Sequence, residues 1–262
     1  MRTMSGRITI FLYGAISYVL FLAVFVYAVG FVGNTIVSNS LDAEPRVPFW
    51  TALAVNVGLL TVFALQHSIM ARKSFKKMWT RIVPKPAERS TYVLFTNAAL
   101  ALMFWQWQPM GGTVWEIEHP VGRAFMYGVF AFGWLMVLAS TFMINHFDLF
   151  GMRQVWLHLR GKEYTPLKFR TPFFYKHIRH PLYVGWFCAF WGTPTMTAAH
   201  FVFAVMTTAY ILIAIQLEER DLMNEHGRAY MQWRKKTPMF IPRLTTKKVT
   251  ETTTAQTDAT IA

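Results

Sequence analysis

The fold of this chain is decided by residues 179–221, which read RHPLYVGWFCAFWGTPTMTAAHFVFAVMTTAYILIAIQLEERD. Within them, 38 consecutive residues from 180 to 217 carry no Lys, Arg, Asp or Glu. A helix crosses the hydrocarbon core of a bilayer in roughly 20 apolar residues, so this stretch is too long for one ordinary span. Because Gly192-Thr193-Pro194 interrupts it and proline breaks or kinks a helix, we predict a hairpin of two helices, at about 182–191 and 196–217. One kinked helix is the alternative.

Four other stretches are free of charged residues and long enough to cross a membrane: 8–41, 47–71, 90–115 and 124–147. The 262 residues are 54% hydrophobic and only 15% charged, against about 25% charged residues in soluble domains. The single cysteine, Cys188, excludes a disulfide-stabilised scaffold. We therefore predict an all-α, polytopic membrane helix bundle. It has four spans, the first near 8–33, plus the C-terminal helix–turn–helix hairpin, which makes five or six membrane segments.

Basic residues are distributed unevenly along the chain. The net charge is +13, and 24 of the 26 Lys and Arg fall in four segments: 2–7, 72–89, 153–179 and 220–248. Cytoplasmic loops carry the excess of Lys and Arg in membrane proteins. We therefore expect both termini in the cytoplasm and a final hydrophobic stretch that enters and returns on one side, which supports the hairpin independently. The chain should be a multi-pass protein of the bacterial inner (cytoplasmic) membrane, and its charge requires no nucleic acid as partner.

The chain divides into three parts by composition. Residues 1–178 hold the N-terminal spans and their loops and are expected to form the substrate side. Residues 179–244 hold the hairpin and a juxtamembrane segment, interrupted near Gly227, and are expected to bind the cofactor. Residues 245–262 are rich in Thr and Ala and contain no aromatic residue, so we predict a disordered tail.

Polar and ionisable residues gather at one predicted depth. Such groups are costly inside a membrane and indicate function by default. With the orientation above, five segments bring them to the cytoplasmic face: Gln66-His67, Glu88 to Tyr92, Asn145 to Asp148, Arg179 to Tyr183, and Glu218 to Asp221. Each has a simpler structural interpretation, such as an interfacial histidine, a helix cap or a solvated helix start. Their convergence on one face is what favours a cytosolic site.

The motif Arg179-His180-Pro181-Leu182-Tyr183-Val184-Gly185, followed by the hairpin, Glu218-Glu219 and Gly227-Arg228-Ala229-Tyr230, resembles integral-membrane methyltransferases. That superfamily includes the isoprenylcysteine carboxyl methyltransferases, the phospholipid methyltransferases and the NnrU-like proteins. The resemblance covers roughly residues 179–242 and implies S-adenosylmethionine bound at the cytosolic face. Carried over by position, it implies cofactor-binding roles for Arg179, His180, Pro181, Tyr183, Gly185, Glu218, Glu219 and Tyr230.

The first 178 residues narrow the resemblance. Gln66 to Arg72, Glu88 to Tyr92 and Asn145 to Gly151 look like the bacterial thiol S-methyltransferases of this superfamily. They imply methyl transfer to a small thiol, above all methanethiol, which yields dimethyl sulfide. The chain departs from the prenylcysteine enzymes in having Trp233 where a tyrosine is common, and Met239-Phe240-Ile241 where an arginine lies between the final prolines. Both departures weigh against a prenylcysteine carboxylate as the acceptor.

Thiol methylation sets clear chemical requirements. The thiol attacks as a thiolate, so the enzyme needs a base or a positive field. We assign the base to His146, oriented by Asp148 or a nearby acid, with His67 second. Arg89 or Arg179 is expected to stabilise the thiolate, and Tyr92, Tyr183 and Trp233 are expected to contact the sulfonium by cation–π attraction. Gln66, Tyr92 and Trp233 complete the expected substrate contacts.

Other functions are weighed against this one. A methyltransferase for a lipid or a prenylcysteine carboxylate is the nearest alternative. A haem-binding electron-transfer protein, with His67 and His146 as ligands, belongs to a different class, as does a transporter. No Gly-rich dinucleotide loop is present, which disfavours a Rossmann-type methyltransferase. We assign no metal ligands and expect the lipid bilayer, rather than an obligate protein partner, to surround the chain.

Overall fold

A computed structural model of the chain describes residues 3–242, and its C-terminal part is the predicted hairpin. Helix α8 (Pro181–Trp191) and helix α9 (Ala198–Lys236) lie side by side and are joined by the short strand β2 (Thr195–Thr197). Helix α9 has a break at Gly227, where φ is 54° and ψ is −127°. The hairpin and the interruption near Gly227 are therefore confirmed, whereas the predicted tail at 245–262 lies outside the described residues.

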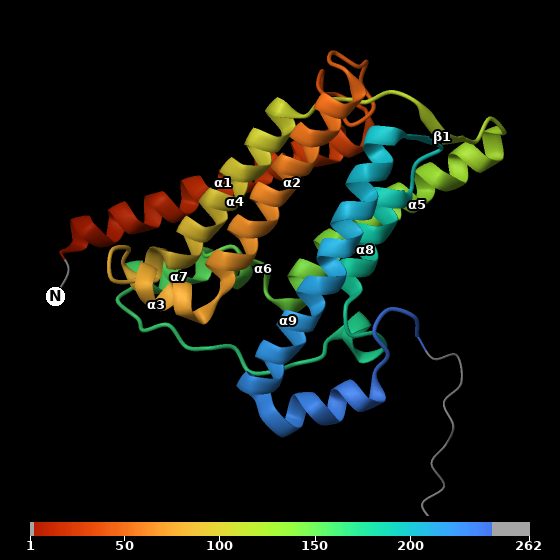
Figure 1. Cartoon of the computed structure of the whole chain (residues 1–262). Coiled ribbons are helices and arrows are strands. Elements are labelled where there is room, and N and C mark those ends of the chain that lie inside the picture. Colours follow the sequence, from red (N-terminus) through yellow and green to blue (C-terminus); the bar gives the residue numbers. More distant parts are fainter. Residues whose placement is uncertain (1–2, 243–262) are drawn as a thin grey trace, which may run out of the picture.

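The N-terminal half is a bundle of three long helices. Helix α4 (Glu88–Gln106) packs against both α1 (Met4–Gly33) and α2 (Phe49–Ala71), as Figure 1 shows. Between and beside them lie the short helices α3 (Lys73–Trp79), η1 (Lys85–Ala87) and α7 (Met152–Leu159). Within residues 3–242, four helices are long and apolar enough to cross a membrane: α1, α2, α9 and α5 (Pro120–Ile144). The polytopic helical fold is thus confirmed.

The third predicted span is shorter than its charge-free stretch. Helix α4 ends at Gln106, and residues 107–112 leave the helix through Gly111 and Gly112, whose φ angles are 66° and 64°. Strand β1 (Thr113–Glu116) follows and pairs antiparallel with β2, with Thr113 opposite Thr197 and Glu116 opposite Thr195. An exclusively helical prediction misses this sheet because three or four residues are too few to display a period of two.

Helices α5 and α8 approach each other closely at two glycines. A Cβ atom on Gly133 of α5 would lie 2.4 Å from the backbone nitrogen of Ala189, and one on Gly185 of α8 would lie 2.8 Å from the backbone nitrogen of Val137. Small residues spaced four apart allow membrane helices to pack backbone against backbone, and Gly185 and Ala189 have that spacing. The α5–α8 pair is therefore the most extensive helix contact in the bundle.

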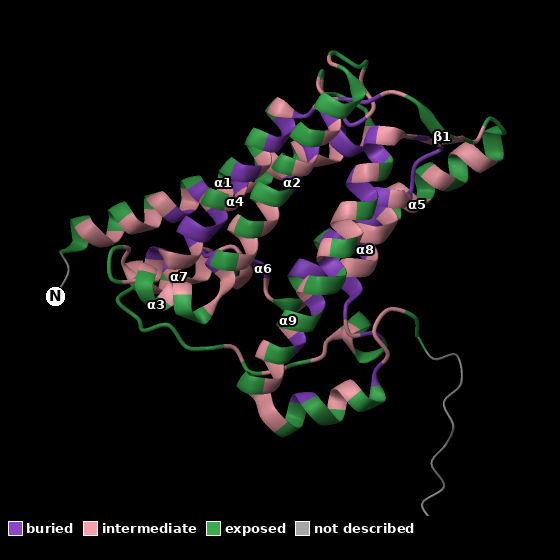
Figure 2. Ribbon diagram, in the orientation of Figure 1, coloured by how far each residue is buried: buried purple, intermediate pink, exposed green. Residues whose placement is uncertain are grey.

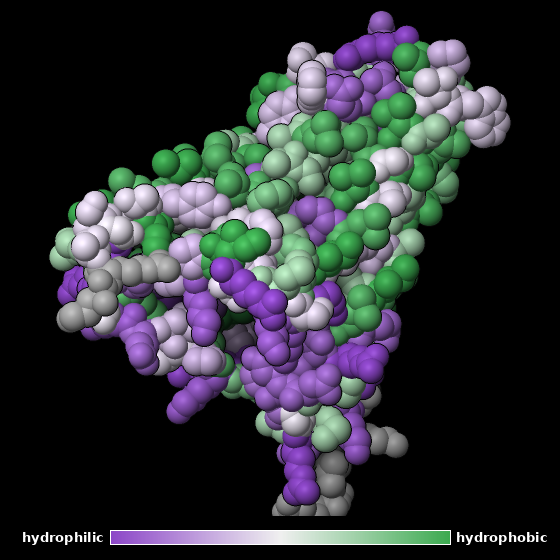
Figure 3. Space-filling model, turned by 60° about the vertical axis from the view of Figure 1, so that its left-hand side comes forward, coloured by the Kyte–Doolittle hydropathy of each residue, from purple (hydrophilic) through white to green (hydrophobic). Residues whose placement is uncertain are grey.

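The two ends of the bundle are formed by different elements, and the surface between them is apolar. Figure 1 shows α3, α7 and the end of α9 at the lower end, and β1 with the loop between α1 and α2 at the upper end. Hydrophilic residues gather at the lower end in Figure 3, which also shows a dark recess there, and again at the upper tip, while the flank between them is mainly hydrophobic. Figure 2 shows the buried residues along the facing sides of the helices. The end rich in basic loops is thus distinct from an apolar middle.

Buried polar contacts close the upper end. Asp42 accepts hydrogen bonds from the Thr197 hydroxyl and the Asn34 side-chain amide, and its Oδ2 lies 2.9 Å from Nδ1 of His200. The other ring nitrogen of His200 is 2.9 Å from the Phe190 carbonyl oxygen. These contacts fasten the loop after α1 to the start of α9, so the two halves are joined far from the predicted site.

Candidate active site

A buried carboxylate organises the start of α8 and the middle of α9. Glu219 is 2% exposed, and its Oε1 accepts from Nε of Arg179 at 2.7 Å and faces Nε2 of His180 at 3.0 Å. Its Oε2 lies 2.8 Å from Nε of Arg234, across the Gly227 break. Buried charges occur where they are paired and hydrogen-bonded. We call Arg179, His180, Glu219 and Arg234, with Tyr183, Glu218 and Tyr230, the carboxylate cluster.

Arg179 also holds the segment after α9. Its Nη1 donates to the carbonyl oxygens of Arg234 and Thr237, at 3.2 and 2.8 Å, and its backbone nitrogen donates to Pro238 at 2.9 Å. Because Nε and Nη1 are bonded within the protein, Arg179 is a weaker candidate than Arg89 for stabilising a thiolate, and that role stays a prediction. The structure instead assigns Arg179 and Glu219 to fixing residues 234–239 against the start of α8.

Two members of the carboxylate cluster keep capacity for a ligand. The Tyr183 hydroxyl donates to Oε2 of the half-buried Glu218 at 2.8 Å, and no further side-chain partner of Glu218 occurs in residues 3–242. The hydroxyl of Tyr230, a residue with 0% exposure, has no hydrogen-bond partner among the described residues. Buried polar groups are normally satisfied, so the Tyr230 hydroxyl, which lies near Glu218 and Glu219, is free to bond a polar ligand group.

Three of the predicted cofactor and substrate residues serve the fold instead. Pro181 is the first residue of α8, where its missing N–H leaves no bond unmade. Gly185 faces α5, because a Cβ atom on it would lie 2.8 Å from the backbone nitrogen of Val137. Trp233 donates from its indole nitrogen to the Tyr175 carbonyl at 3.1 Å, within the short helix η2 (Phe173–Lys176), and packs on Phe169. The contacts of Gly185 and Trp233 are thus within the fold, and their roles in binding cofactor and substrate stay predictions.

His146 lies at the end of α5 in a cage of aromatic rings. It begins the short helix α6 (His146–Leu149) and is 3% exposed. Its ring stacks on Phe142, with centroids 4.2 Å apart, and Phe150 is 4.8 Å away. Burial lowers the pKa of the His146 imidazole below its ordinary value of 6.5, so the ring is neutral at pH 7 and can accept a proton.

The hydroxyl partners of His146 identify its tautomer. Nδ1 is 2.8 Å from Thr141 Oγ1, whose own proton is donated to the Leu138 carbonyl at 2.7 Å. Thr141 therefore accepts, and Nδ1 carries the ring proton. Nε2, at 2.8 Å from the Tyr18 hydroxyl, is left as the basic nitrogen and accepts from Tyr18. Such second partners fix which nitrogen of a histidine is reactive.

Asp148 does not orient His146, contrary to the sequence-based expectation. Asn145 caps α6 by accepting from the backbone nitrogen of Asp148 at 3.1 Å, which turns the carboxylate away from the imidazole. Asp148 instead pairs with Arg153 at 2.9 Å and accepts from Tyr164 at 3.3 Å. It anchors the loop after α7, and hydroxyl groups take the orienting role that was assigned to an acid.

His67 and Tyr92 meet between α2 and α4. The Tyr92 hydroxyl is 2.9 Å from Nε2 of His67, and the His67 ring stacks on Phe63 at 5.4 Å. The Arg89 guanidinium lies 5.6 Å from the Tyr92 ring centroid. Gln66 is bonded through Nε2 to the Met70 sulfur at 3.2 Å, and its buried Oε1 has no partner within the described part of the chain. The structure thus brings the predicted catalytic residues His67 and Arg89 to the predicted substrate residue Tyr92.

The two histidines belong to one aromatic cluster. Phe21 stacks on Phe150, with ring centroids 3.7 Å apart, and both rings contact His146. The same two rings pack against Met70 and Tyr92. We call His67, Tyr92, His146, Tyr18, Phe21 and Phe150, with Gln66 and Arg89, the histidine cluster. It is mainly aromatic, with two imidazoles and one nearby cation.

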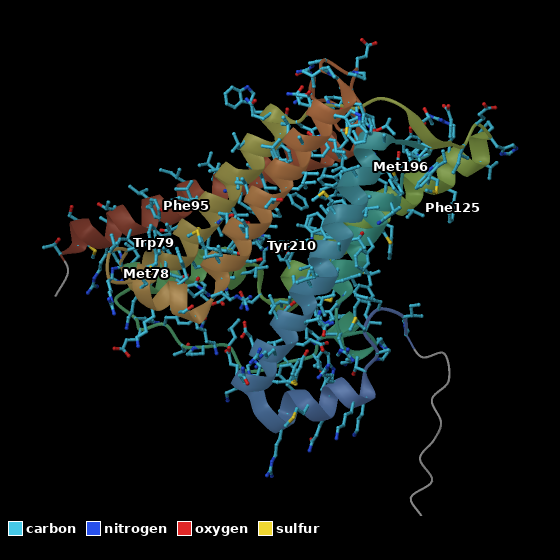
Figure 4. The ribbon with its side chains drawn as sticks, in the orientation of Figure 1. Met78, Trp79, Phe95, Phe125, Met196 and Tyr210 are labelled. Carbon is cyan, nitrogen blue, oxygen red and sulfur yellow. The ribbon has the colours of Figure 1, made fainter. Side chains whose placement is uncertain are left out.

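The histidine and carboxylate clusters lie on opposite sides of the contact between α2 and α9. Ser68 Oγ is 3.1 Å from the Tyr210 hydroxyl, and Arg72 Nη1 is 3.1 Å from Asp221. Figure 4 shows Tyr210 on the side of α9 that faces α2. Sequence reasoning missed Tyr18, Tyr210 and Arg234, because a single tyrosine in an apolar span and a basic residue in a basic tail give no distinctive signal.

Comparison with known proteins identifies relatives along nearly the whole chain. The Phospholipid methyltransferase family profile matches residues 121–228. A methanethiol S-methyltransferase of Crocosphaera subtropica is 59% identical, over 90% of this chain and 93% of that protein. The methanethiol S-methyltransferase of Mycobacterium tuberculosis is 49% identical, over 88% and 95%. Nurim of Sus scrofa is 29% identical, over 69% and 71%. No solved structure matches at a significant level.

Proposed function

Because the chain belongs to the methanethiol S-methyltransferase family, we propose that it transfers a methyl group from S-adenosylmethionine to methanethiol and releases dimethyl sulfide. It is a multi-pass membrane methyltransferase. The sulfonium donor, when bound, supplies an activated methyl group. The chain must then hold the acceptor sulfur in line with that group and take up the thiol proton. The observation that carries the proposal is the adjacency of the histidine and carboxylate clusters across α2 and α9.

The carboxylate cluster is the proposed donor side. Glu218 is half-buried and retains acceptor capacity beside Tyr183, which suits the hydroxyl or ammonium groups of the donor. The unpaired Tyr230 hydroxyl is a second polar contact, and the Tyr183 ring supplies a π-face for the sulfonium, an attraction of roughly 0.5–2 kcal/mol. The positions of Tyr183 and Glu218 are fixed by the neighbouring contacts of Glu219 with Arg179 and His180.

The histidine cluster is the proposed acceptor side. Its phenylalanine rings give methanethiol an apolar surface, and sulfur makes favourable contacts with aromatic rings. Nε2 of His146 is the proposed base, reached through the Tyr18 hydroxyl that already donates to it at 2.8 Å. As the thiol proton passes to the Tyr18 oxygen, the Tyr18 proton passes to Nε2. Arg89 lies near enough to Tyr92 and His67 to stabilise the thiolate electrostatically.

The basic end of the bundle is the proposed cytoplasmic end. The positive charge of α3, α7 and the end of α9, and the position of both clusters towards these elements, support a site that faces the cytosol. We propose the inner membrane of a bacterium as the location. Residues 1–178 then form the acceptor side and residues 179–244 the donor side, with α5 as the support of α8.

The direct test supplies purified enzyme in lipid nanodiscs with S-adenosylmethionine and methanethiol and measures dimethyl sulfide in the headspace. We expect turnover, and calorimetric binding of S-adenosylmethionine without the thiol. His146→Asn should reduce turnover by about 100-fold or more, the usual contribution of a general base, while leaving donor binding intact. His67→Asn should retain more activity. If His67→Asn were inactive and His146→Asn active, the base assignment would be reversed.

The alternatives predict different products. A lipid or prenylcysteine enzyme would methylate phospholipid or a farnesylcysteine analogue in the same nanodiscs, so both are included as acceptors. A haem protein would show a Soret band. Against haem ligation, both ring nitrogens of His146 are occupied by hydroxyls, at 2.8 Å each, and His67 is bonded to Tyr92. The proposed substrate would be overturned if the enzyme methylated a lipid and produced no dimethyl sulfide.

A further inference from the structure

Tyr210 stands between the two halves of the proposed site. It projects from α9 two helical turns before Glu218, and its hydroxyl is 3.1 Å from Ser68 Oγ on α2. Its ring meets Phe63 edge-on, with centroids 6.2 Å apart. Phe63 in turn stacks on His67. Tyr210 therefore contacts the helix that carries Gln66 and His67 while belonging to the helix that carries Glu218.

The surroundings of Tyr210 link it to both clusters. It lies close enough to Tyr92, in the histidine cluster, and to Tyr183, in the carboxylate cluster, to interact electrostatically with each. Neither of these tyrosines is its hydrogen-bond partner. The side chain is half-buried, and Figure 4 shows it facing α2. Its position between the two clusters suits a group that sets the distance between them.

Other contacts between α2 and α9 are weaker candidates for this role. The Arg72–Asp221 pair has side chains that are 36% and 43% exposed, and exposed ion pairs contribute little. The Lys73–Glu225 pair joins α3, the next helix along the chain, to α9; its charged atoms are 3.8 Å apart and its side chains are more exposed still. Both pairs lie further from the apolar middle than Ser68. The Ser68–Tyr210 hydrogen bond is thus the contact nearest to Gln66 and His67 that joins the halves.

We propose that Tyr210 is a positioning residue that, through Ser68, holds the acceptor wall of α2 in register with the donor side of α9. The inference rests on the proposed function. Loss of its hydroxyl frees α2 to shift relative to Glu218 and Tyr183, and a small misplacement of reactants is costly in a displacement reaction. The donor contacts themselves stay in place, because Tyr183, Glu218 and Tyr230 do not depend on Ser68.

The experiment is a double-mutant cycle on the full chain in nanodiscs. Tyr210→Phe and Ser68→Ala each remove one partner of the bond, and the double variant removes both. We expect each single variant to lower kcat/KM for methanethiol by roughly threefold to tenfold, about the net value of one neutral hydrogen bond. The double variant should lose no more than either single one. The dissociation constant for S-adenosylmethionine should change by less than about twofold, in keeping with intact donor contacts.

A matched control lies two residues away on the same helix. Thr208 accepts from the indole nitrogen of Trp191 at 3.0 Å, a bond between α9 and α8 inside the C-terminal half. Thr208→Val should leave kcat/KM for methanethiol unchanged. The inference is overturned if the two single losses multiply in the double variant, if Tyr210→Phe matches the wild type, or if donor affinity falls as far as kcat/KM. Absence of dimethyl sulfide from the wild type would overturn the proposed function, and this inference with it.

Discussion

Replacing Glu219 by glutamine tests whether this carboxylate holds α8 and α9 together or binds the methyl donor directly. The substitution removes the charge that Arg179, His180 and Arg234 surround, while keeping the shape of the side chain. Breaking a buried ion pair from one side costs about 3–5 kcal/mol, because the remaining charges stay buried without compensation. Arg234 is 39% exposed and can turn to water, whereas Arg179 is 11% exposed and cannot. We therefore expect a loss of about 3 kcal/mol, at the lower end of that range.

The assay is thermal unfolding in nanodiscs, paired with calorimetric titration of S-adenosylmethionine. At about 2–4 °C per kcal/mol for a chain of this size, Glu219→Gln should lower the unfolding temperature by roughly 6–12 °C. Glu218→Gln is the matched control one residue away. It removes a half-buried carboxylate bonded to Tyr183 alone, so it should unfold near the wild-type temperature and bind the donor more weakly. The reasoning is refuted if Glu219→Gln keeps wild-type stability and loses donor binding.

Three further outcomes are expected. Because burial lowers the pKa of His146 below 6.5, the acid limb of a pH profile of kcat/KM should lie below pH 6.5. The His146 imidazole therefore binds a proton more readily in the unfolded chain than in the folded chain. As the pH drops below about 6.5, the unfolding temperature should also fall. Gly133→Ala should destabilise the bundle by about 1–3 kcal/mol or more through overpacking, whereas Gly128→Ala on the same helix, with nothing within 4 Å, should not; equal unfolding temperatures would contradict the close α5–α8 contact. Asp148→Asn should leave turnover within about threefold of wild type, as expected for a loop anchor, while Arg89→Gln should lower kcat/KM by about tenfold or more; a large loss in Asp148→Asn alone would restore the acid to the proton path.

The spans and the hairpin were predictable because membrane segments obey simple rules. Charge-free length and the position of basic loops depend on the solvent, not on packing, so they can be read from residues 180–217 directly. The break at Gly227 followed from glycine alone. What escaped prediction was set by long-range pairing, as in the two strands, each of which is stable only because the other lies beside it.

The sequence predicted which residues form the site better than it predicted which partners they contact. His67 and Tyr92 meet as expected, and so do Tyr183 and Glu218, because each pair lies at one depth on neighbouring helices. The partners of His146 were mistaken, since Asp148 is close in sequence but Tyr18 and Thr141 are close in space. Gly185 was assigned to the cofactor although its lack of a side chain serves helix packing. Proximity along the chain is a weak guide where a helix ends.

The strands β1 and β2 at the tip of the hairpin supply hydrogen-bond partners to backbone that is not helical. Helix α8 has 11 residues and so measures about 16 Å, roughly half of a hydrocarbon core about 30 Å thick. Residues 192–197 continue from α8 in non-helical form, so their peptide groups need hydrogen-bond partners from another segment. The Ile117 nitrogen donates to Pro194, the Ala198 nitrogen donates to Gly112, and β1 pairs with β2. Residues 107–119, which look like a mere connector, thereby supply the hydrogen-bond partners that the non-helical turn after the short helix α8 requires.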